Sequence, residues 1–442
     1  MTTYWCERVW VGDGPVDAVR VSVGDEGRIE WVATGVSAQD EDIRLSGLVF
    51  PGFANAHSHA FHRALRGRTH SGGGTFWTWR EGMYAVAERL DPDSYLALAR
   101  ATYAEMAMAG ITCVGEFHYL HHGADGTPYD DPNAMGHALQ QAAWEAGVRL
   151  TLLDAAYFKG GLTPEGHQLL DPVQRRFSDW NVDTWATRVS RIEPTDVVRV
   201  GLAAHSVRAV EKLDIGRIGA LARERDTVLH LHLSEQPAEN DACRGYYLSS
   251  PTELLEDEGV LGPWVTAVHG THLSERDVKL LGSSRSNVCF SPTTERDLAD
   301  GIGPATQLRD AGAVLTLGSD QHAVIDMFEE ARALELDERL ATLERGRFRP
   351  DQLVRAATVD GHRSLGWPDA GRIEPGARGD LVAVRLDSVR TAGCSPTQVV
   401  MAATAADVTD VVVDGQHVVR DGEHRLGDVG RLLAEAIEPL WR

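Results

Sequence analysis

The chain has 442 residues, of which 43% are hydrophobic and 24% charged, and this length suits one barrel-sized domain with a smaller one. Its formal net charge is −22. Such a charge repels phosphate backbones and anionic lipids, which argues against binding to nucleic acid or to membranes.

The N-terminal sequence MTTYWCERVW has no basic stretch followed by an apolar one, so we expect a cytoplasmic protein. Short strand-like runs broken by Gly and Asp occupy residues 9–35, and the same pattern returns over residues 379–422. Two separate extensions would each leave an apolar sheet face unpaired. We therefore assign residues 1–47 and 368–442 to one discontinuous β-sandwich domain.

Between these segments, residues 48–367 alternate strand-like and helix-like runs, which is typical of repeated βα units. The eight strand candidates begin at Leu48, Ile111, Val148, Val197, Thr227, Val265, Ser286 and Ala313. The helix before the second strand has Asp91 as a cap and Pro92 in its first turn, and Gly110 ends it. The pattern predicts an α/β fold, a (β/α)8 TIM-type barrel.

Active sites of such barrels lie at the carboxyl ends of the strands, and most of the predicted strands end in metal-binding or charged residues. These strand-end residues are His57, His59, Glu116, His205, His232, His269 and Asp320. His57 and His59 are two residues apart, so on a strand they point to the same face. Alone, this pair also fits two hydrogen-bonded histidines in a polar pocket, but the whole set favours a metal site.

The strand-end histidines and aspartate, in a barrel flanked by a split β domain, resemble the amidohydrolase superfamily over nearly the whole chain. Within it, "HLHLSE", "VHGTHL" and "LGSDQH" resemble the ammonia-releasing deaminases. The combination of "HSHAFHRAL", "FWTWREGMY", "GEFHYLHH", "AAHSVRAV" and "HLHLSEQPAE" is similar to the N-formimino-L-glutamate (formimidoylglutamate) deiminase family. His62 departs from this family, in which a glutamine is expected.

The resemblance implies hydrolytic deimination of N-formimino-L-glutamate to N-formyl-L-glutamate and ammonia in histidine degradation, by a homodimer. It implies a metal site with the ligands His57, His59, His232 and Asp320. The fourth strand ends in "VGLAAHSVR", without a lysine to bridge two metals, and Lys159 is better explained as a surface residue. We therefore expect one divalent metal per chain, zinc, which binds imidazole and carboxylate ligands.

The expected chemistry follows from this site. A bound metal lowers the pKa of water from 15.7 to about 7, and the resulting hydroxide would attack the formimino carbon. His269 would accept the proton of the water or hold the hydroxide in line, and Glu235 would relay a proton to the leaving nitrogen, with Asp320 sharing the relay. Glu235 alternatively serves as a structural carboxylate that fixes a ring N–H.

A substrate with two carboxylates calls for guanidinium groups. Arg208, three residues after His205, and Arg80, in a long first loop that could act as a lid, are the candidates. For Arg80 a surface salt bridge is the alternative. Further substrate hydrogen bonds are assigned to Tyr119, His205 and His62, whereas His118, His121 and His122 are interpreted as hydrogen-bonding loop residues.

Two other functions remain open. A deaminase of an aminoheterocycle such as guanine, cytosine or a triazine would use the same metal site, but a neutral ring gains little from two arginines. A non-catalytic scaffold on this fold would be expected to have lost metal ligands, and all the expected positions are occupied here.

Overall fold

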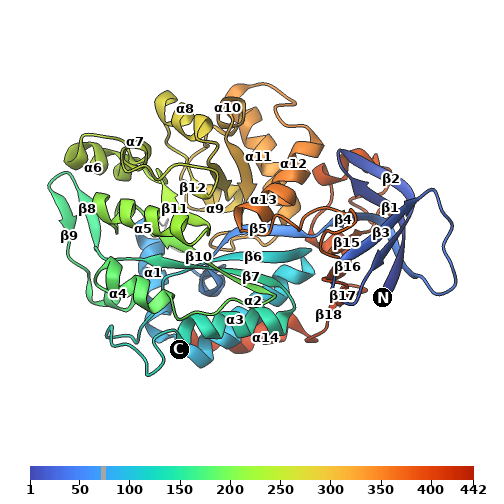
Figure 1. The fold of residues 1–442 in the computed structure, drawn as a ribbon, viewed down its shortest axis with the longest axis horizontal. Helices are drawn as coiled ribbons and strands as arrows, with labels where there is room; N and C mark the ends of the chain where they lie inside the picture. The colour runs from blue at the N-terminus through green and yellow to red at the C-terminus, as the bar shows by residue number, and fades with distance from the viewer. Residues whose placement is uncertain (71–75) are drawn as a thin grey trace.

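A barrel of eight parallel strands forms the larger part of the molecule (Figure 1), for which the computed structural model describes residues 1–70 and 76–442. The barrel strands are β5 (Phe53–Ser58), β6 (Ile111–His118), β7 (Arg149–Ala156), β10 (Val198–Ala204), β11 (Leu229–Leu233), β12 (Val265–His269), β13 (Asn287–Phe290) and β14 (Val314–Leu317). Most of their residues are buried, as expected for parallel strands covered by helices. The predicted barrel is confirmed.

The first and last strands meet at a short seam. β5 and β14 are joined by an isolated parallel bridge between Ser58 and Asp320. The Asp320 N–H donates to the His57 carbonyl at 3.0 Å, and the His59 N–H donates to the Asp320 carbonyl at 3.1 Å. The seam therefore runs through three of the predicted metal ligands.

Helices cover the outside of the barrel (Figure 1). They are α1 (Phe76–Arg89), α2 (Pro92–Met108), α3 (Ala134–Ala146), α4 (Val182–Val189), α5 (Lys212–Glu224), α6 (Pro237–Tyr247), α7 (Pro251–Asp257), α8 (Glu275–Ser283), α9 (Pro292–Asp297), α10 (Ala305–Ala311), α11 (Met327–Thr342), α12 (Pro350–Ala357) and α13 (Val359–Ser364). Helix α2 begins as predicted, because the Asp91 side chain accepts the Ser94 N–H in a capping box. Among the helices of residues 1–70 and 76–442, none is long and apolar enough to cross a membrane.

The second sheet is built from both ends of the chain and lies to one side of the barrel (Figure 1). Its strands are β1 (Thr2–Val11), β2 (Gly14–Val23), β3 (Ile29–Thr34), β4 (Ile43–Pro51), β15 (Leu381–Val384), β16 (Val408–Val413), β17 (Gln416–Arg420) and β18 (Glu423–His424). They form one mixed sheet in which β1 and β4 are parallel and the other pairs antiparallel. Its own core includes Val9, Val21, Leu45 and Leu381.

The predicted first strand, residues 48–56, is two strands in the structure. Its first part belongs to β4, which pairs with β1 and β15, and its second part is β5 of the barrel. The chain changes sheets at Gly52, where a Cβ atom would lie 2.2 Å from Thr112 Oγ1. Both parts are buried and apolar, so the hydrophobic pattern could not reveal the change of partner.

The C-terminal segment returns to the barrel beside the predicted site. Helix α14 (Val429–Ile437) packs against α2, and the chain ends in a short 3-10 helix (Glu438–Trp441). The Trp441 indole N–H donates to the Ala64 carbonyl at 3.0 Å. Ala64 belongs to the 3-10 helix Ala60–Leu65, which directly follows His59 and carries His62. The C-terminus therefore braces the segment behind the first strand.

Candidate active site

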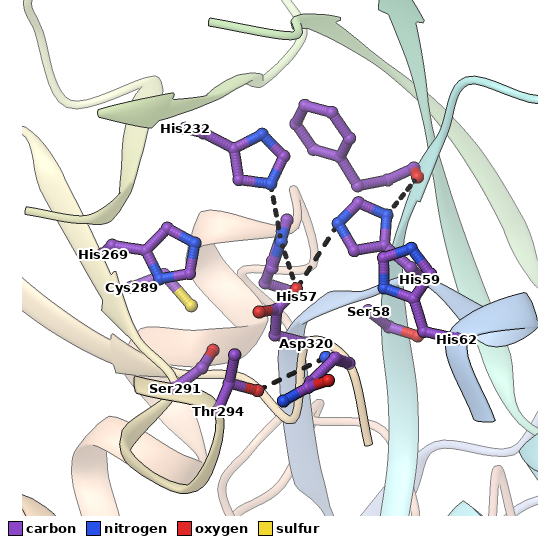
Figure 2. Close-up of polar contacts among 12 residues, drawn as sticks. His57, Ser58, His59, His62, His232, His269, Cys289, Ser291, Thr294 and Asp320 are labelled. Atoms are coloured by element: carbon purple, nitrogen blue, oxygen red, sulfur yellow. Dashed lines mark hydrogen bonds and ion pairs between the residues drawn. The ribbon is translucent and has the colours of Figure 1, made fainter. Parts of the chain in front are cut away.

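Four of the predicted ligands converge at the carboxyl end of the barrel strands. One ligand atom from each of His57, His59, His232 and Asp320 lies within 4.8 Å of the others. Asp320 Oδ1 is 3.2 Å from His57 Nε2 and 3.4 Å from His59 Nε2, and His57 Nε2 is 3.2 Å from His232 Nε2. Figure 2 shows the three rings and the carboxylate pointing toward one another.

In the rings of His59 and His232, Nδ1 forms a hydrogen bond away from the cluster, which leaves Nε2 available to bind a metal. His59 Nδ1 donates to the Phe117 carbonyl and His232 Nδ1 donates to the His205 carbonyl, both at 2.9 Å. A ring that donates through Nδ1 presents the lone pair of Nε2 to the cluster. Burial, with the neighbouring His57, lowers the pKa of His59 to about 3, so this ring is neutral, as a metal ligand must be. The donor set of three imidazoles and a carboxylate fits zinc.

The backbone at this end of the barrel is strained. Ser234, His269, Asp320 and His322 have φ values of 51°, 71°, 42° and 61°. Residues other than glycine seldom adopt this left-handed region, and such strain persists only where the surrounding contacts impose it. Three of these residues follow or end a barrel strand, so the strain turns their side chains into the pocket or supports the turns beside it.

His269 lies next to the ligand cluster but does not join it. Its ring stacks on that of His232, with the centroids 5.6 Å apart. Its Nδ1 is 3.4 Å from Glu295 Oε1 and its Nε2 is 3.9 Å from Glu235 Oε1. Burial alone would lower the pKa of His269, but the charge of Glu235 and the hydrogen bond with Glu295 raise it to about 10. The two carboxylates therefore favour the protonated imidazolium.

One pocket gathers the predicted site residues. It is lined by His59, His62, Arg80, Tyr119, His205, Arg208, His232, Glu235, His269 and Asp320, together with further residues from the same loops. Of the predicted ligands and substrate contacts, only the fully buried His57 lies behind this lining. Proton-transfer candidates, guanidinium groups and the ligand cluster thus face a common space.

Arg208 reaches the pocket from the turn after β10. Its Nη2 donates to Glu235 Oε2 at 2.8 Å, and its Nε lies 3.1 Å from Glu239 Oε2 and 3.3 Å from Ser206 Oγ. The side chain is 19% exposed. A guanidinium held on one side by fixed groups loses little conformational freedom when it binds a carboxylate.

Arg80 corrects the prediction of a long lid loop, because it lies on helix α1. Its Nε donates to Tyr84 Oη at 2.5 Å, and its guanidinium carbon is 5.1 Å from the centre of the Tyr84 ring. The run "FWTWREGMY" belongs to helix α1, whose later residues, among them Arg80, Glu81, Met83 and Ala85, are good helix formers. Arg80 still lines the pocket, but from a regular element.

Aromatic side chains and neutral histidines form another part of the pocket wall. His62 Nε2 lies 3.0 Å from Tyr119 Oη, so these two groups share a hydrogen bond. His205 contacts the Tyr119 and Tyr157 rings, at 5.5 Å and 4.6 Å between centroids. Burial lowers the pKa of both histidines, so both are neutral hydrogen-bonding groups.

Other residues of the strand ends lie outside the pocket. Glu116 accepts the Ser58 hydroxyl at 2.7 Å and the Ala60 N–H at 2.6 Å, beneath the ligand cluster. Lys159 is partly exposed and pairs with Glu211 at 3.4 Å.

His121 and His122 form hydrogen bonds as the sequence suggested, whereas His118 is the last residue of strand β6 and not a loop residue. His118, His121 and Asp154 are also close enough to hold an ion, but Arg188 already pairs with Asp154 at 2.7 Å, and its positive charge disfavours a cation there. His121 donates to the Ala155 carbonyl at 2.9 Å, and His122 contacts Asp179 at 3.1 Å.

Sequence reasoning missed Glu239, Glu295 and Tyr157. Glu239 contacts Arg208, Glu295 contacts His269, and the Tyr157 ring contacts that of His205. Glu239 and Glu295 lie on helices α6 and α9 that follow strands β11 and β13. The only signal in the sequence is that each carboxylate comes within a few residues of a strand end, and surface helices have many such carboxylates.

Comparison with known proteins gives a consistent result. The sequence profile of the Amidohydrolase family matches residues 48–418. Formimidoylglutamate deiminase of Pseudomonas aeruginosa is 34% identical over 441 residues, which cover 96% of each chain. 8-Oxoguanine deaminase of the same bacterium is 28% identical over 392 residues, which cover 88% of this chain and 85% of that protein. The crystal structure of an amidohydrolase from Brucella melitensis superposes with a TM-score of 0.90 over the full length of both chains, at 30% identity.

Proposed function

The chain belongs to the amidohydrolase family, and we propose that it hydrolyses N-formimino-L-glutamate to N-formyl-L-glutamate and ammonia. The observation that carries this proposal is that two guanidinium groups, Arg208 and Arg80, line the pocket of the ligand cluster. The substrate has two carboxylates, and a guanidinium binds a carboxylate through two parallel hydrogen bonds. We assign the reaction to histidine degradation in the cytoplasm and expect a homodimer.

The metal of this metal-dependent family would be held by His57, His59, His232 and Asp320. We propose a single zinc ion, because His205 rather than a lysine follows the fourth barrel strand. When bound, zinc is a Lewis acid that makes water more acidic and therefore more nucleophilic at neutral pH.

The reaction exchanges one nitrogen for one oxygen. Water adds to the formimino carbon, and the bond from that carbon to its terminal nitrogen breaks. The oxygen of water stays on the carbon as the formyl oxygen, and the nitrogen leaves as ammonia. One proton must therefore leave the water and one must reach the departing nitrogen.

Two residues are placed to move these protons. Without a metal, Glu235 and Glu295 favour the imidazolium of His269, but the positive charge of a bound metal would lower the pKa of this ring. The neutral ring would then accept the proton of the water at Nε2, and the two carboxylates would stabilise the imidazolium that forms. Glu235 Oε1, 3.9 Å from His269 Nε2, passes a proton to the leaving nitrogen. Asp320 shares the relay at the ligand cluster, where its carboxylate lies 3.2 Å from His57 Nε2.

The two arginines divide the carboxylates of the substrate. The formimino nitrogen is attached to the α-carbon, so the α-carboxylate must lie near the reacting carbon. Arg208, which Glu235 and Glu239 hold close to His269, is assigned to this carboxylate. Arg80 on helix α1 is assigned to the distal carboxylate, and His62, Tyr119 and His205 provide hydrogen bonds along the wall.

The second candidate is a deaminase of an aminoheterocycle. The relation to 8-oxoguanine deaminase supports it, at 28% identity. The same ligand cluster would serve that reaction, but a neutral ring leaves two guanidinium groups without carboxylates.

Ammonia release from a panel of compounds tests the proposal. The panel contains the formimino derivatives of glutamate, aspartate and glycine, and aminoheterocycles that include guanine and cytosine. We expect N-formimino-L-glutamate to have the highest kcat/KM. A heterocycle that is turned over faster than every formimino compound would overturn the proposal.

A further inference from the structure

One buried carboxylate that has no assigned role contacts both Arg208 and the turn that carries Glu235. Glu239 lies in the first turn of helix α6, and its side chain is fully buried. Its Oε1 accepts the backbone N–H of Ser234 at 2.7 Å, and its Oε2 lies 3.1 Å from Arg208 Nε. A charged group in this position is costly to bury unless it is paired.

The contact with Ser234 fixes the turn that presents Glu235. Ser234 lies between His232 and Glu235, and its φ of 51° is in the left-handed region. A hydrogen bond to an ionised carboxylate is stronger than one between neutral groups. Glu239 therefore helps to hold a strained backbone conformation that would otherwise relax and move the Glu235 side chain.

The contact with Arg208 fixes the direction of the guanidinium. Nε donates to Ser206 Oγ at 3.3 Å and forms an ion pair with Glu239 Oε2 at 3.1 Å without a hydrogen bond, and Nη2 donates to Glu235. Among the described residues, the hydrogen bonds that the Arg208 side chain donates are made by Nε and Nη2 and none by Nη1. The side of the guanidinium that includes Nη1 is thus the one on which Arg208 can receive a carboxylate from the pocket that it lines.

We propose that Glu239 is a positioning residue that holds Arg208 and the Glu235 turn as one unit, and thereby sets the selectivity for substrates with an α-carboxylate. This inference rests on the proposed function. An incoming carboxylate competes for the guanidinium with Glu235, whose side chain is 7% exposed, and with Glu239, whose side chain is 0% exposed. Leaving the more deeply buried charge unpaired costs more. Glu239 therefore keeps Arg208 in place while Glu235 turns to the leaving nitrogen.

A double-mutant cycle with two substrates tests this role. The variants are Glu239→Gln, Arg208→Ala and the double variant, and Asp241→Asn on the exposed face of the same helix is the control. The substrates are N-formimino-L-glutamate and N-formimino-4-aminobutyrate, which lacks the α-carboxylate. For each protein the ratio of the two kcat/KM values is measured. The ratio comes from one preparation, so it does not depend on the fraction of folded protein.

We expect Glu239→Gln to lower kcat/KM for N-formimino-L-glutamate by roughly 100-fold, the scale of a small misplacement of a binding group. The ratio of the two substrates should fall toward that of Arg208→Ala, and the double variant should lose little more selectivity than either single variant. Glu239→Asp keeps the charge but is one methylene shorter, so it should recover part of the ratio. Asp241→Asn should leave the ratio unchanged.

Equal losses on both substrates, or a double variant whose loss of selectivity is the sum of the single losses, would overturn the inference and leave Glu239 as a structural brace. Failure of the proposed function gives a different result, because the wild-type protein would then release no ammonia from N-formimino-L-glutamate. In that case calorimetric binding of L-glutamate to wild type, Glu239→Gln and Asp241→Asn decides the role of Glu239. Equal affinity in all three proteins would overturn it.

Discussion

The residues of the pocket fall into groups that can hold a metal, groups that can move protons and groups that can bind carboxylates. The distinction rests on contacts. His57, His59 and His232 direct ring nitrogens at Asp320, whereas the nitrogens of His269 face the carboxylates of Glu235 and Glu295. A substitution in each group should therefore impair a different property: metal binding, proton transfer or carboxylate binding.

His269→Asn should keep the metal and lose turnover. The residue lies outside the ligand cluster, so metal content should remain near one equivalent per chain. Removal of a positioned acid or base lowers kcat by about 10²-fold or more. Elemental analysis and steady-state ammonia release measure the two effects, with the exposed His137→Asn as a control. Loss of the metal together with activity would instead make His269 a ligand.

Arg208→Ala and Arg80→Ala should differ in the step that they impair. Removing one partner of a desolvated charge pair costs about 2–5 kcal/mol. Arg208→Ala should raise the activation free energy that kcat/KM reports by this amount, because the reacting carbon is also misplaced. Arg80→Ala should mainly raise KM and should abolish the preference for N-formimino-L-glutamate over its side-chain amide. Arg217→Ala, on the surface, is the control. Near wild-type kinetics of Arg208→Ala on both substrates would refute the assignment.

At the scale of elements, hydrogen bonds across the seam between β5 and β14 hold the backbone that carries ligands of the cluster. Asn55 on β5 donates to Ser319 Oγ at 2.7 Å and accepts the Ser319 N–H at 2.9 Å, next to Asp320. These fully buried side-chain bonds supplement the isolated bridge that closes the barrel. Loosening them would shift the first strand against the eighth, and both carry ligands.

Asn55→Ala should therefore lower the free energy of unfolding by about 1–3 kcal/mol, the cost of leaving buried polar groups unpaired, and should also weaken metal retention. Urea denaturation measures the first effect, and competition with a chelator measures the second. Asn181→Ala is a matched control, because it removes the N-cap of α4 at a cost of about 1 kcal/mol far from the ligands. Equal metal retention in both variants would show that the seam does not support the site.

The barrel strands and their terminal ligands could be predicted because the hydrophobic pattern locates each strand and parallel topology brings the strand ends together. The boundary at Gly52 could not, since apolar residues on either side of it pack into different sheets. Arg80 was misassigned to a loop because a segment rich in aromatic and glycine residues precedes it. Glu239 and Glu295 were missed because their partners are set by the positions of helices α6 and α9, which no local pattern encodes.

At the scale of the molecule, a buried ion pair joins the barrel to the terminal sheet. Arg149, the first residue of β7, donates through Nη1 to Asp380 Oδ1 at 2.9 Å and lies 3.1 Å from Asp414. Asp380 also accepts the Thr112 hydroxyl at 3.1 Å. Arg149 and Asp380 are almost completely buried. The junction is therefore a place where loss of one charge leaves the other unpaired in the interior.

Asp380→Asn should lower the free energy of unfolding by roughly 3–5 kcal/mol at neutral pH. Burial alone would raise the pKa of Asp380, but Arg149 lowers it to about 2, below the unfolded value of about 3.9. The ion pair therefore makes its full contribution to the free energy of unfolding above about pH 4, and this contribution is lost as the pH falls toward 2. Urea denaturation at pH 7 and at pH 3 measures this change. Asp387→Asn removes an exposed ion pair and should leave the free energy of unfolding almost unchanged. An equally small effect of Asp380→Asn would contradict the prediction.

The central claim is that a metal held by His57, His59, His232 and Asp320 enables this chain to release ammonia from N-formimino-L-glutamate. The most direct measurement is ammonia release by chelator-treated protein during titration with zinc. We predict that the treated protein is inactive and that activity rises linearly to a plateau at one zinc ion per chain. Full activity of the treated protein, a plateau at two ions, or no ammonia at any zinc concentration would contradict the account.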